Sequence, residues 1–570
     1  MLSAIKDIGE LAIQKEGTID MQREGKVLTI LLDTDKQAYC STDIEDFDSG
    51  KIKQYLFKEG ASKGNVPSPF CPLTEPQKTF KKIQGWVKQC KDIKDDTLKA
   101  NVPLIDGAVE ALAANKDAII ADITLKIKDF PKKTSKFLTI KPDGKYLGEY
   151  DVFKRCLAHF TEEKRKKSAA TSVCSICGIA HKQVSARTEV FKFDSDDKPG
   201  FIAGGFDKAQ NWKNFPVCAE CKKSLEDGRK FIESNLNFKF VYDGLNYLLI
   251  PRMLIGGQKP LEEIMAILSD STRKITLKER IKKRITSDEN EILEYLSDAK
   301  DVLTLNFLFL HSQQSAERIL LLIEDVFPSR VRKIFEAKDY VDKVFNNDSD
   351  KGFTFGTIRT FFSKSDENKK SNNLNKYFLE IVDSVFRGKR LDFSFLLMFF
   401  MVSIRKDFTN SETIFKVKEA LMDTVFFENL GLITFEEVEV MEESIFSSVF
   451  ARYGRSFGNP AKRGVFLMGA LTQLLLNKQW SDRNAKPFMK KLKGLRMDER
   501  DIRALLPEVQ NKLEEYDAFD KGKRLIASES AKYLLEAGDA WKMTVDEINF
   551  YFACGMSLAD SVADIAYSKN

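Results

Sequence analysis

The chain has 570 residues, of which 43% are hydrophobic and 31% are charged. This balance provides both a core and a solvated surface, so it excludes a wholly disordered chain, and the length predicts about two to four domains. The net charge of +5, from 90 basic and 85 acidic residues, is too small for this length to indicate a partner, so only the distribution of charge is informative.

The first part of the chain mixes helix and strand patterns. Residues 1–17 have the spacing of an amphipathic helix, and the acidic residues within them exclude a secretory signal. Lys26–Asp35 is typical of a buried strand, and Phe137–Leu147 predicts a hairpin closed by Pro-Asp-Gly. We therefore expect a mixed α/β region at the start of a cytoplasmic protein.

Four of the nine cysteines form two C-x2-C pairs, Cys174 with Cys177 and Cys218 with Cys221. Each pair makes a tight turn that directs two thiolates at one tetrahedral centre, so the spacing predicts one bound zinc ion. Because four thiolates leave no position for an activated water, a structural ion is favoured over a catalytic one. The other five cysteines are scattered along the sequence, and we do not expect disulfide bonds in a cytosolic chain.

Forty residues separate the two pairs, so a small insertion is expected to fold between them. It contains a predicted strand, Thr188–Phe193, and a glycine-rich segment, Gly200–Gly205. His181 could replace a thiolate, but with four cysteines present we interpret it as a surface histidine. A helix is predicted to follow the second pair, with a core face made by Leu225, Ile232 and Leu236.

From about residue 290 onward the pattern is mainly helical. Ala316–Val326 is apolar on one side, and Pro328 is expected to open the next helix, where its missing amide does no harm. Phe393–Val402 is very apolar, but it is about half as long as the ~20 residues that cross a bilayer, so it predicts a buried helix and no membrane partner. Residues Thr544 and Glu547 have the spacing of a helix capping box.

The sequence therefore predicts an α+β fold in four parts. We expect a mixed α/β N-terminal region over residues 1–170 and a zinc module with its glycine-rich insertion over residues 171–240. A mainly helical region is expected over residues 241–435, followed by a C-terminal helical bundle over residues 436–570.

Charge is uneven within the expected bundle. Residues 451–500 hold twelve basic and three acidic residues, whereas residues 501–570 hold eight basic and thirteen acidic ones. Such an excess, with Trp480 and other aromatic residues interleaved, favours contact with a phosphate backbone as much as a merely solvated face. A second basic run lies near the first cysteine pair. The candidate phosphate-binding residues are Lys164, Arg165, Lys166, Lys167, Arg452, Arg455, Lys462, Arg463, Lys486, Lys490, Lys491, Lys493 and Arg496.

Catalytic motifs are not found in the sequence. None of the three histidines precedes an aspartate, and H-E-x-x-H, G-x-S-x-G and the phosphate-binding G-x4-G-K-[ST] are missing. We therefore expect a protein that is not an enzyme. Two alternatives stay open: a metal-dependent nuclease or other nucleic-acid-modifying enzyme, and a zinc-stabilised scaffold that binds only proteins.

Three segments resemble a known family. The segment FPVCAECKKSLEDG (Phe215–Gly228), PFMKKLKGLRMDERDIRALLPEVQNKLEEY (Pro487–Tyr516) and DEINFYFACGMSLAD (Asp546–Asp560) are similar to the large subunit of type I-B CRISPR interference (Cascade) complexes. The resemblance implies a non-enzymatic subunit of an RNA-guided surveillance complex in antiviral defence. It also implies that the C-terminal bundle resembles a small subunit of such complexes.

The partners implied by this resemblance are crRNA, target double-stranded DNA, the backbone, handle-binding and small subunits, and a helicase-nuclease. Such large subunits read the protospacer-adjacent motif in duplex DNA through loops, and amide and ammonium groups can read base edges. The candidates for this role are Asn211, Lys213 and Asn214, although a loop that only covers the zinc module is an equal alternative. Met441 is a candidate internal start for a separate small subunit.

Overall fold

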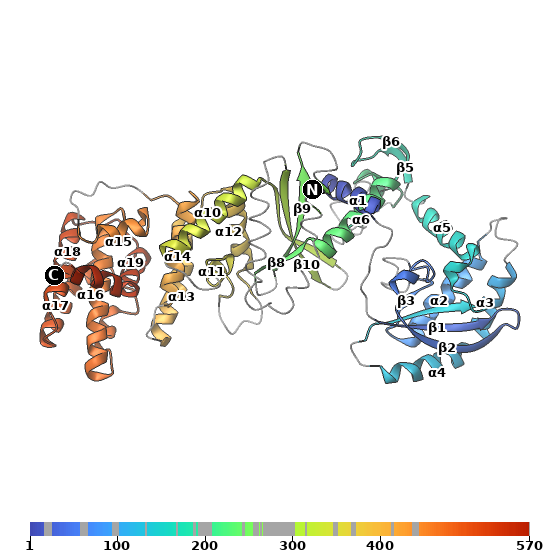
Figure 1. The fold of residues 1–570 in the computed structure, drawn as a ribbon, viewed down its shortest axis with the longest axis horizontal. Helices are drawn as coiled ribbons and strands as arrows, with labels where there is room; N and C mark the ends of the chain where they lie inside the picture. The colour runs from blue at the N-terminus through green and yellow to red at the C-terminus, as the bar shows by residue number, and fades with distance from the viewer. Residues whose placement is uncertain are drawn as a thin grey trace. The chain divides into compact units, whose positions relative to one another are not determined.

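The computed structural model shows two compact units (Figure 1). One unit comprises residues 2–229 and 312–317, and the other comprises Met1 with residues 230–311 and 318–570. The structure describes residues 1–15, 25–57, 66–93, 102–130, 134–166, 169–185, 190–191, 208–241, 245–254, 261–262, 265, 303–313, 316–345, 352–365, 372–411, 415–435 and 444–568.

A four-stranded sheet forms the core of the first unit, in the order β2-β1-β4-β3. Strand β1 (Lys26–Asp33) pairs antiparallel with β2 (Ala38–Asp46) and parallel with β4 (Lys136–Pro142), which pairs antiparallel with β3 (Cys71–Pro72). The predicted buried strand is thus confirmed. Its successive residues are buried on both faces, because aromatic side chains such as Tyr55 and Phe70 cover the face of Val27 and helices cover the face of Leu28. These helices are α2 (Pro76–Lys91), α3 (Val102–Ala114), α4 (Lys116–Lys126) and α5 (Asp151–Lys166).

The hairpin predicted over Phe137–Leu147 is wrong. The Pro-Asp-Gly turn does form, with Asp143 and Gly144 both at positive φ, but the chain then enters the short helix η4 (Leu147–Glu149) instead of a second strand. The Asp143 carboxylate accepts hydrogen bonds from the backbone N–H of Thr34 at 2.8 Å and from its hydroxyl at 2.5 Å. The turn is therefore tied to the end of β1, and β4 takes its partners from far along the chain.

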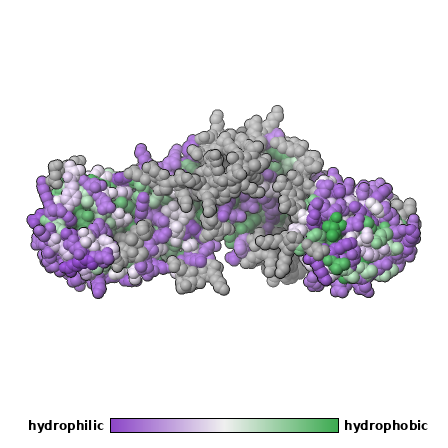
Figure 2. All heavy atoms as spheres, turned by 60° about the horizontal axis from the view of Figure 1, so that its bottom comes forward, coloured by the Kyte–Doolittle hydropathy of each residue, from purple (hydrophilic) through white to green (hydrophobic). Residues whose placement is uncertain are grey.

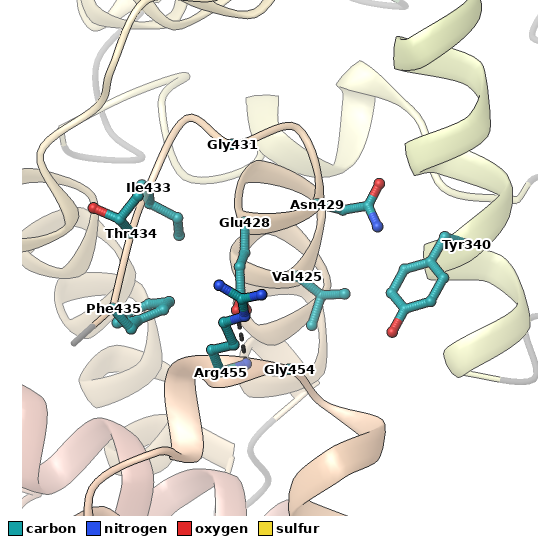
Figure 3. A pocket seen from close by; sticks show the side chains of 10 residues that line it. All are labelled: Tyr340, Val425, Glu428, Asn429, Gly431, Ile433, Thr434, Phe435, Gly454 and Arg455. Atoms are coloured by element: carbon teal, nitrogen blue, oxygen red, sulfur yellow. Dashed lines mark hydrogen bonds between the residues drawn. The ribbon is translucent and has the colours of Figure 1, made fainter. Parts of the chain in front are cut away.

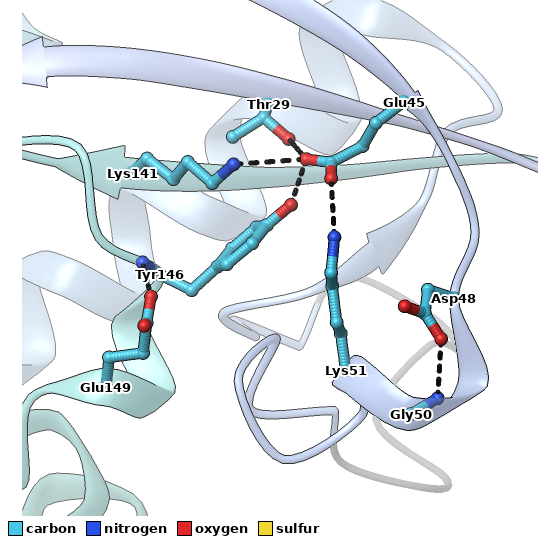
Figure 4. A network of polar contacts seen from close by, with 8 residues as sticks. All are labelled: Thr29, Glu45, Asp48, Gly50, Lys51, Lys141, Tyr146 and Glu149. Carbon is cyan, nitrogen blue, oxygen red and sulfur yellow. Dashed lines mark hydrogen bonds and ion pairs between the residues drawn. The ribbon is translucent and has the colours of Figure 1, made fainter.

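A polar cluster centred on Glu45 of β2 joins residues of three strands of this sheet to residues outside it (Figure 4). The Glu45 carboxylate accepts hydrogen bonds from the Tyr146 hydroxyl and, at 3.2 Å, from the Thr29 hydroxyl. It also pairs with Lys141 at 3.3 Å and Lys51 at 3.4 Å. Although burial alone would raise the pKa of Glu45, these donors and cations outweigh it and lower that pKa. The cluster holds strand β2 against residues that follow β4.

The cysteine pairs lie in a small module of strands and one helix. Strands β5 (Ala169–Val173) and β6 (Ala180–Ser185) form a hairpin, and β7 (Val217–Cys218) joins β6. Short helix η5 (Lys208–Lys213) precedes β7, and α6 (Ala219–Asn235) follows it. The predicted core face of that helix is confirmed, since Leu225, Ile232 and Leu236 are all buried. The expected strand Thr188–Phe193 and segment Gly200–Gly205 lie largely or wholly outside the described residues.

Helix α1 (Leu2–Lys15) packs against α6 through two glycines. A Cβ atom on Gly9 would lie 1.8 Å from the Ser224 carbonyl oxygen, and one on Gly228 would lie 2.0 Å from that of Ile5. The two backbones therefore approach more closely than any side chain would allow. The predicted N-terminal helix is confirmed, and its docking site is the helix that carries Cys221.

The second unit begins with another four-stranded sheet, in the order β11-β10-β9-β8. Its strands are β8 (Asn237–Val241), β9 (Leu245–Met253), β10 (Leu303–Gln313) and β11 (Ala316–Val326). The helical interpretation of Ala316–Val326 is therefore wrong, and from residue 303 onward the first helix that the structure describes begins at Pro328. A short apolar run fits a strand or a buried helix equally well, and here pairing with β10 decides in favour of the strand.

Helices α10 (Pro328–Val344), α11 (Phe355–Arg359), α12 (Asn375–Arg387), α13 (Phe393–Ser411) and α14 (Phe415–Asn429) follow the sheet. Pro328 opens α10 as predicted. Phenylalanine rings join helix to sheet, with ring centroids 4.9 Å apart for Phe240 and Phe355 and 4.7 Å apart for Phe307 and Phe386. Among the described helices, none combines the length and apolarity needed to cross a membrane, and the Phe393–Val402 stretch lies in α13.

The C-terminal helices pack around α16 (Pro460–Arg483), the orange helix of Figure 1. Around it lie α15 (Ser447–Arg452), η6 (Arg455–Phe457), η7 (Pro487–Leu492), α17 (Glu499–Glu515), α18 (Lys521–Glu536), α19 (Val545–Ser557) and α20 (Ala559–Ser568). The Thr544–Glu547 capping box at the start of α19 is confirmed. Figure 2 shows one face of these helices, which is mainly hydrophilic.

Candidate metal centre and nucleic-acid interface

The first cysteine pair lies in the turn between β5 and β6. The N–H of Gly178 donates to the Cys174 carbonyl at 2.9 Å, and the N–H of Cys174 donates to the Ile179 carbonyl at 3.0 Å. Gly178 has a φ of +71°, a left-handed conformation that glycine adopts without strain. These bonds curl the chain so that Cys174 and Cys177 both face the same point.

The second pair lies at the junction of β7 and α6. Cys218 pairs with Val184 of the neighbouring strand, and Cys221 lies in the first turn of the helix. A backbone hydrogen bond of 2.7 Å from Ser175 to the carbonyl of Pro216 joins the two cysteine loops directly. The local sequence around each cysteine pair determines the conformation of its own loop. This hydrogen bond and the pairing of β6 with β7 then bring the two loops together.

The four sulfur atoms meet in one cluster, within 4.8 Å of one another. A tetrahedral ion with sulfur ligands at about 2.3 Å places those sulfurs about 3.8 Å apart, so the cluster needs only a slight contraction to bind one. Three of the cysteines are buried and Cys177 is half-buried. Among the described residues, this is the one cluster of three or more ligating side chains, and it is able to hold a metal ion.

The protein environment favours a thiolate at Cys174. Burial acts to raise the pKa of this thiol, but backbone N–H groups of Cys177, Cys218 and Ile176 point at its sulfur and lower the pKa to about 6. The N–H of Cys218 lies 3.4 Å from this sulfur. Burial raises the pKa of both Cys218 and Cys221, so these two sulfurs need an added positive charge to ionise.

The base-reading candidates near this centre are only partly described. Lys213 ends η5 and is exposed, with its ammonium nitrogen 5.8 Å from the ring centroid of Trp212, and Asn214 is exposed beside it. The side chain of Asn211 lies outside the described residues, as do those of Lys164, Arg165 and Lys166 at the end of α5 and the whole of Lys167. The side chain of His181, in β6, is also outside them.

The C-terminal cations fall into two groups. In the first group, Arg452 donates to the Val344 carbonyl at 2.7 Å, and Arg463 donates to that of Phe457 at 2.7 Å. Lys462 is mostly buried and pairs with Glu547 at 3.9 Å. These cations therefore take part in packing between helices, and the sequence pattern did not distinguish them from surface cations.

The second group follows the end of α16 and is more exposed. Here Lys491 pairs with Glu508 at 3.1 Å and Lys493 pairs with Asp501 at 2.5 Å. Hydrogen bonding to Asp501 raises the pKa of Lys493. Lys490 and Arg496 are exposed and form no ion pair with any described residue. Their charge is therefore the most available for a phosphate backbone.

A pocket in the second unit was not foreseen (Figure 3). It has a volume of about 410 Å³ and lies between Tyr340 of α10, the end of α14 and the turn at Gly454 and Arg455. The Glu428 carboxylate accepts a hydrogen bond of 2.7 Å from the backbone N–H of Arg455. Gly454, with a φ of +89°, leaves room for this carboxylate, so Glu428 serves to cap the turn. No local signal marks the pocket, because its residues come from three distant segments.

Comparison with protein families gives three consecutive matches. Residues 1–159 match the N-terminal domain of CRISPR-associated protein TM1802 (cas_TM1802), residues 171–326 match its central domain, and residues 353–570 match its C-terminal domain. Together the matches run through almost the whole chain. No curated protein matches the sequence.

Proposed function

Because the chain belongs to the CRISPR-associated TM1802 family and so has a role in CRISPR defence, we propose that it is the non-catalytic large subunit of a type I-B surveillance complex. In this role it binds the crRNA-containing complex and target DNA, recognises the protospacer-adjacent motif and helps to recruit the helicase-nuclease. The similarity of three segments to type I-B large subunits supports this assignment within the family.

The observation that carries the proposal is the exposed cationic surface after α16. Lys490 and Arg496 project from a well-packed helical support without described ion-pair partners, in a segment where basic residues outnumber acidic ones by twelve to three. A phosphate backbone is the natural counter-charge for such a surface. Contacts of this kind carry no base information, so this surface holds nucleic acid while other residues read its sequence.

We also propose that the four cysteines bind one structural zinc ion. Four cysteine sulfurs within 4.8 Å of one another, three of them on buried residues, favour zinc in a closed tetrahedral site. The ion would tie the β5–β6 turn to the start of α6, and α1 packs on that helix through Gly9. Elemental analysis of the purified chain should give one zinc per molecule, and Cys218→Ser should lose it. A Cys218→Ser protein that keeps its zinc and assembles normally would refute the structural role.

The first experiment is expression of the tagged chain with its neighbouring genes, followed by isolation of the complex. We expect partner subunits and a guide RNA to be isolated with it. A complex that contains only proteins would favour the scaffold alternative. Magnesium-dependent cleavage of DNA by the pure chain would favour the nuclease alternative.

The second experiment measures duplex binding as a function of salt. We expect affinity to fall steeply with salt, and the double variant Lys490→Gln/Arg496→Gln should reduce the slope of log K against log salt by about 2, since each phosphate contact contributes about 0.9. Lys512→Gln is the matched control, because Lys512 pairs with Glu515 at 2.5 Å on α17. An unchanged slope in the double variant would contradict the proposed interface.

A further inference from the structure

Trp480 is a large apolar side chain left exposed near the end of the longest described helix. Its side chain is 48% exposed, whereas Trp86 and Trp541 are 2% and 3% exposed and belong to the core. The exposed tryptophan ring presents a flat aromatic face to solvent, so the groups around it indicate what it can bind.

One cation, Lys486, lies beside this indole, and other basic residues are close to it in the sequence. The ammonium nitrogen of Lys486 lies 5.5 Å from the centroid of the Trp480 ring, and the Arg483 guanidinium lies 4.9 Å from that of Tyr516. Over residues 478–500, eight basic residues stand against three acidic ones. A protein partner with an apolar face would offer no counter-charge to Lys490 and Arg496, which form no ion pair with any described residue, whereas a nucleic acid supplies both a flat base for the ring and phosphates for the cations.

The surface around the indole is held rigidly. Gln479, the residue before Trp480, is buried, and its side-chain oxygen accepts a hydrogen bond of 3.1 Å from the backbone N–H of Phe488. Phe488 and Leu492 are themselves buried, so η7 and its lysines are fixed beside the helix end. Asn484 ends α16 in a left-handed conformation, and its N–H donates to the Trp480 carbonyl at 2.8 Å. The backbone that carries the ring and the lysines is therefore already ordered before binding.

From this arrangement we infer that Trp480 is a stacking platform for an unpaired nucleobase, with Lys486 beside it and Lys490 of η7 available to the flanking phosphates. The inference rests on the proposed role in nucleic-acid binding and specifies it further. Paired bases in a duplex already stack on their neighbours, so this platform selects single-stranded nucleic acid. Within the proposed complex, its ligand is a strand that has been separated from its complement.

The test compares binding of a fluorescent oligothymidylate and of a matched-length duplex to the full chain. Trp480→Ala should weaken single-strand binding by about tenfold to a hundredfold, because one stacked base contributes that much, and should leave duplex binding unchanged. Trp480→Tyr should restore most of the loss. Leu535→Ala is the matched control, since Leu535 on α18 is another exposed apolar residue of the C-terminal helices. This variant should bind the single strand and the duplex as tightly as the wild type does.

The outcomes separate this inference from the function on which it rests. If the Lys490→Gln/Arg496→Gln variant flattens the salt dependence and Trp480→Ala changes nothing, the interface stands and the stacking platform is refuted. The stacking platform is also refuted if Trp480→Ala weakens single-strand and duplex binding equally. The same holds if Trp480→Ala removes a protein subunit from the complex and leaves DNA binding intact. If the wild-type chain binds neither oligonucleotide, both proposals fail.

Discussion

The crossing of α16 and α19 provides a sharp test of how the C-terminal helices pack. A Cβ on Gly555 would lie 1.8 Å from the Phe466 carbonyl oxygen, and one on Gly469 would lie 2.0 Å from that of Phe552. Ordinary contact begins at 3.4 Å, so Gly555→Ala would force the two backbones apart by roughly 1.5 Å. Because these are backbone atoms, no rotamer change relieves the contact.

The magnitude follows from two opposing terms. Replacing a helical glycine by alanine gains about 1 kcal/mol of helix propensity. Overpacking a core costs about 1–3 kcal/mol. Because the new methyl group meets backbone atoms that cannot move aside, we expect a cost near the upper end of this range. We therefore expect Gly555→Ala to lower the free energy of unfolding of these helices by about 2 kcal/mol.

Hydrogen–deuterium exchange of the full chain can measure this change region by region. A loss of 2 kcal/mol should speed exchange of the most protected α16 and α19 amides by about thirtyfold. Gly85→Ala in α2 is the control, because its new Cβ would meet only Pro67 at 3.5 Å, and it should slow exchange locally. Exchange in Gly555→Ala that is as slow as in the wild type would refute the argument.

Three further predictions concern buried charges. Glu317→Gln should destabilise its unit by about 3–5 kcal/mol, because it removes the charged carboxylate that lies 2.5 Å from the Arg229 guanidinium, which is only 10% exposed. Urea unfolding measures this change, and equal stability of the variant and the wild type would contradict the prediction. The lowered pKa of Glu45 means that its stabilising contribution is full above the usual value of 4.5 and is lost as the pH falls through the folded-state value. The difference in the free energy of unfolding between the wild type and Glu45→Gln should therefore disappear in acid. A difference that does not change with pH would refute this prediction. Asp423 is fully buried, without a hydrogen-bond partner, and burial followed by the charge of Glu419 raises its pKa well above 3.8. Asp423→Asn should consequently stabilise the protein at pH 7 but not at pH 3, and a melting temperature that is unchanged at pH 7 would exclude this.

Local chemistry made part of the fold predictable. The two C-x2-C loops, the Pro328 start of α10 and the Thr544 cap each depend on a few neighbouring residues, and each is present as expected. A proline inside a helical run, such as Pro507, predicts either a kink or two short helices, and α17 is one helix from Glu499 to Glu515, which excludes the second alternative. The buried residues Ile502, Leu505, Val509 and Leu513 lie on both sides of the proline, so one core face continues through it.

The sequence by itself identified the four cysteines of the cluster and the excess of basic charge near the C-terminus, because both are properties of residue type and short spacing. Only the tertiary structure decided which of those cations are available. Lys462 and Arg463 are held within the packing of helices, whereas Lys490 and Arg496 stand clear of described partners. It likewise decided that Ala316–Val326 is a strand and that Trp480 is exposed, because strand pairing and burial depend on residues far away in the chain.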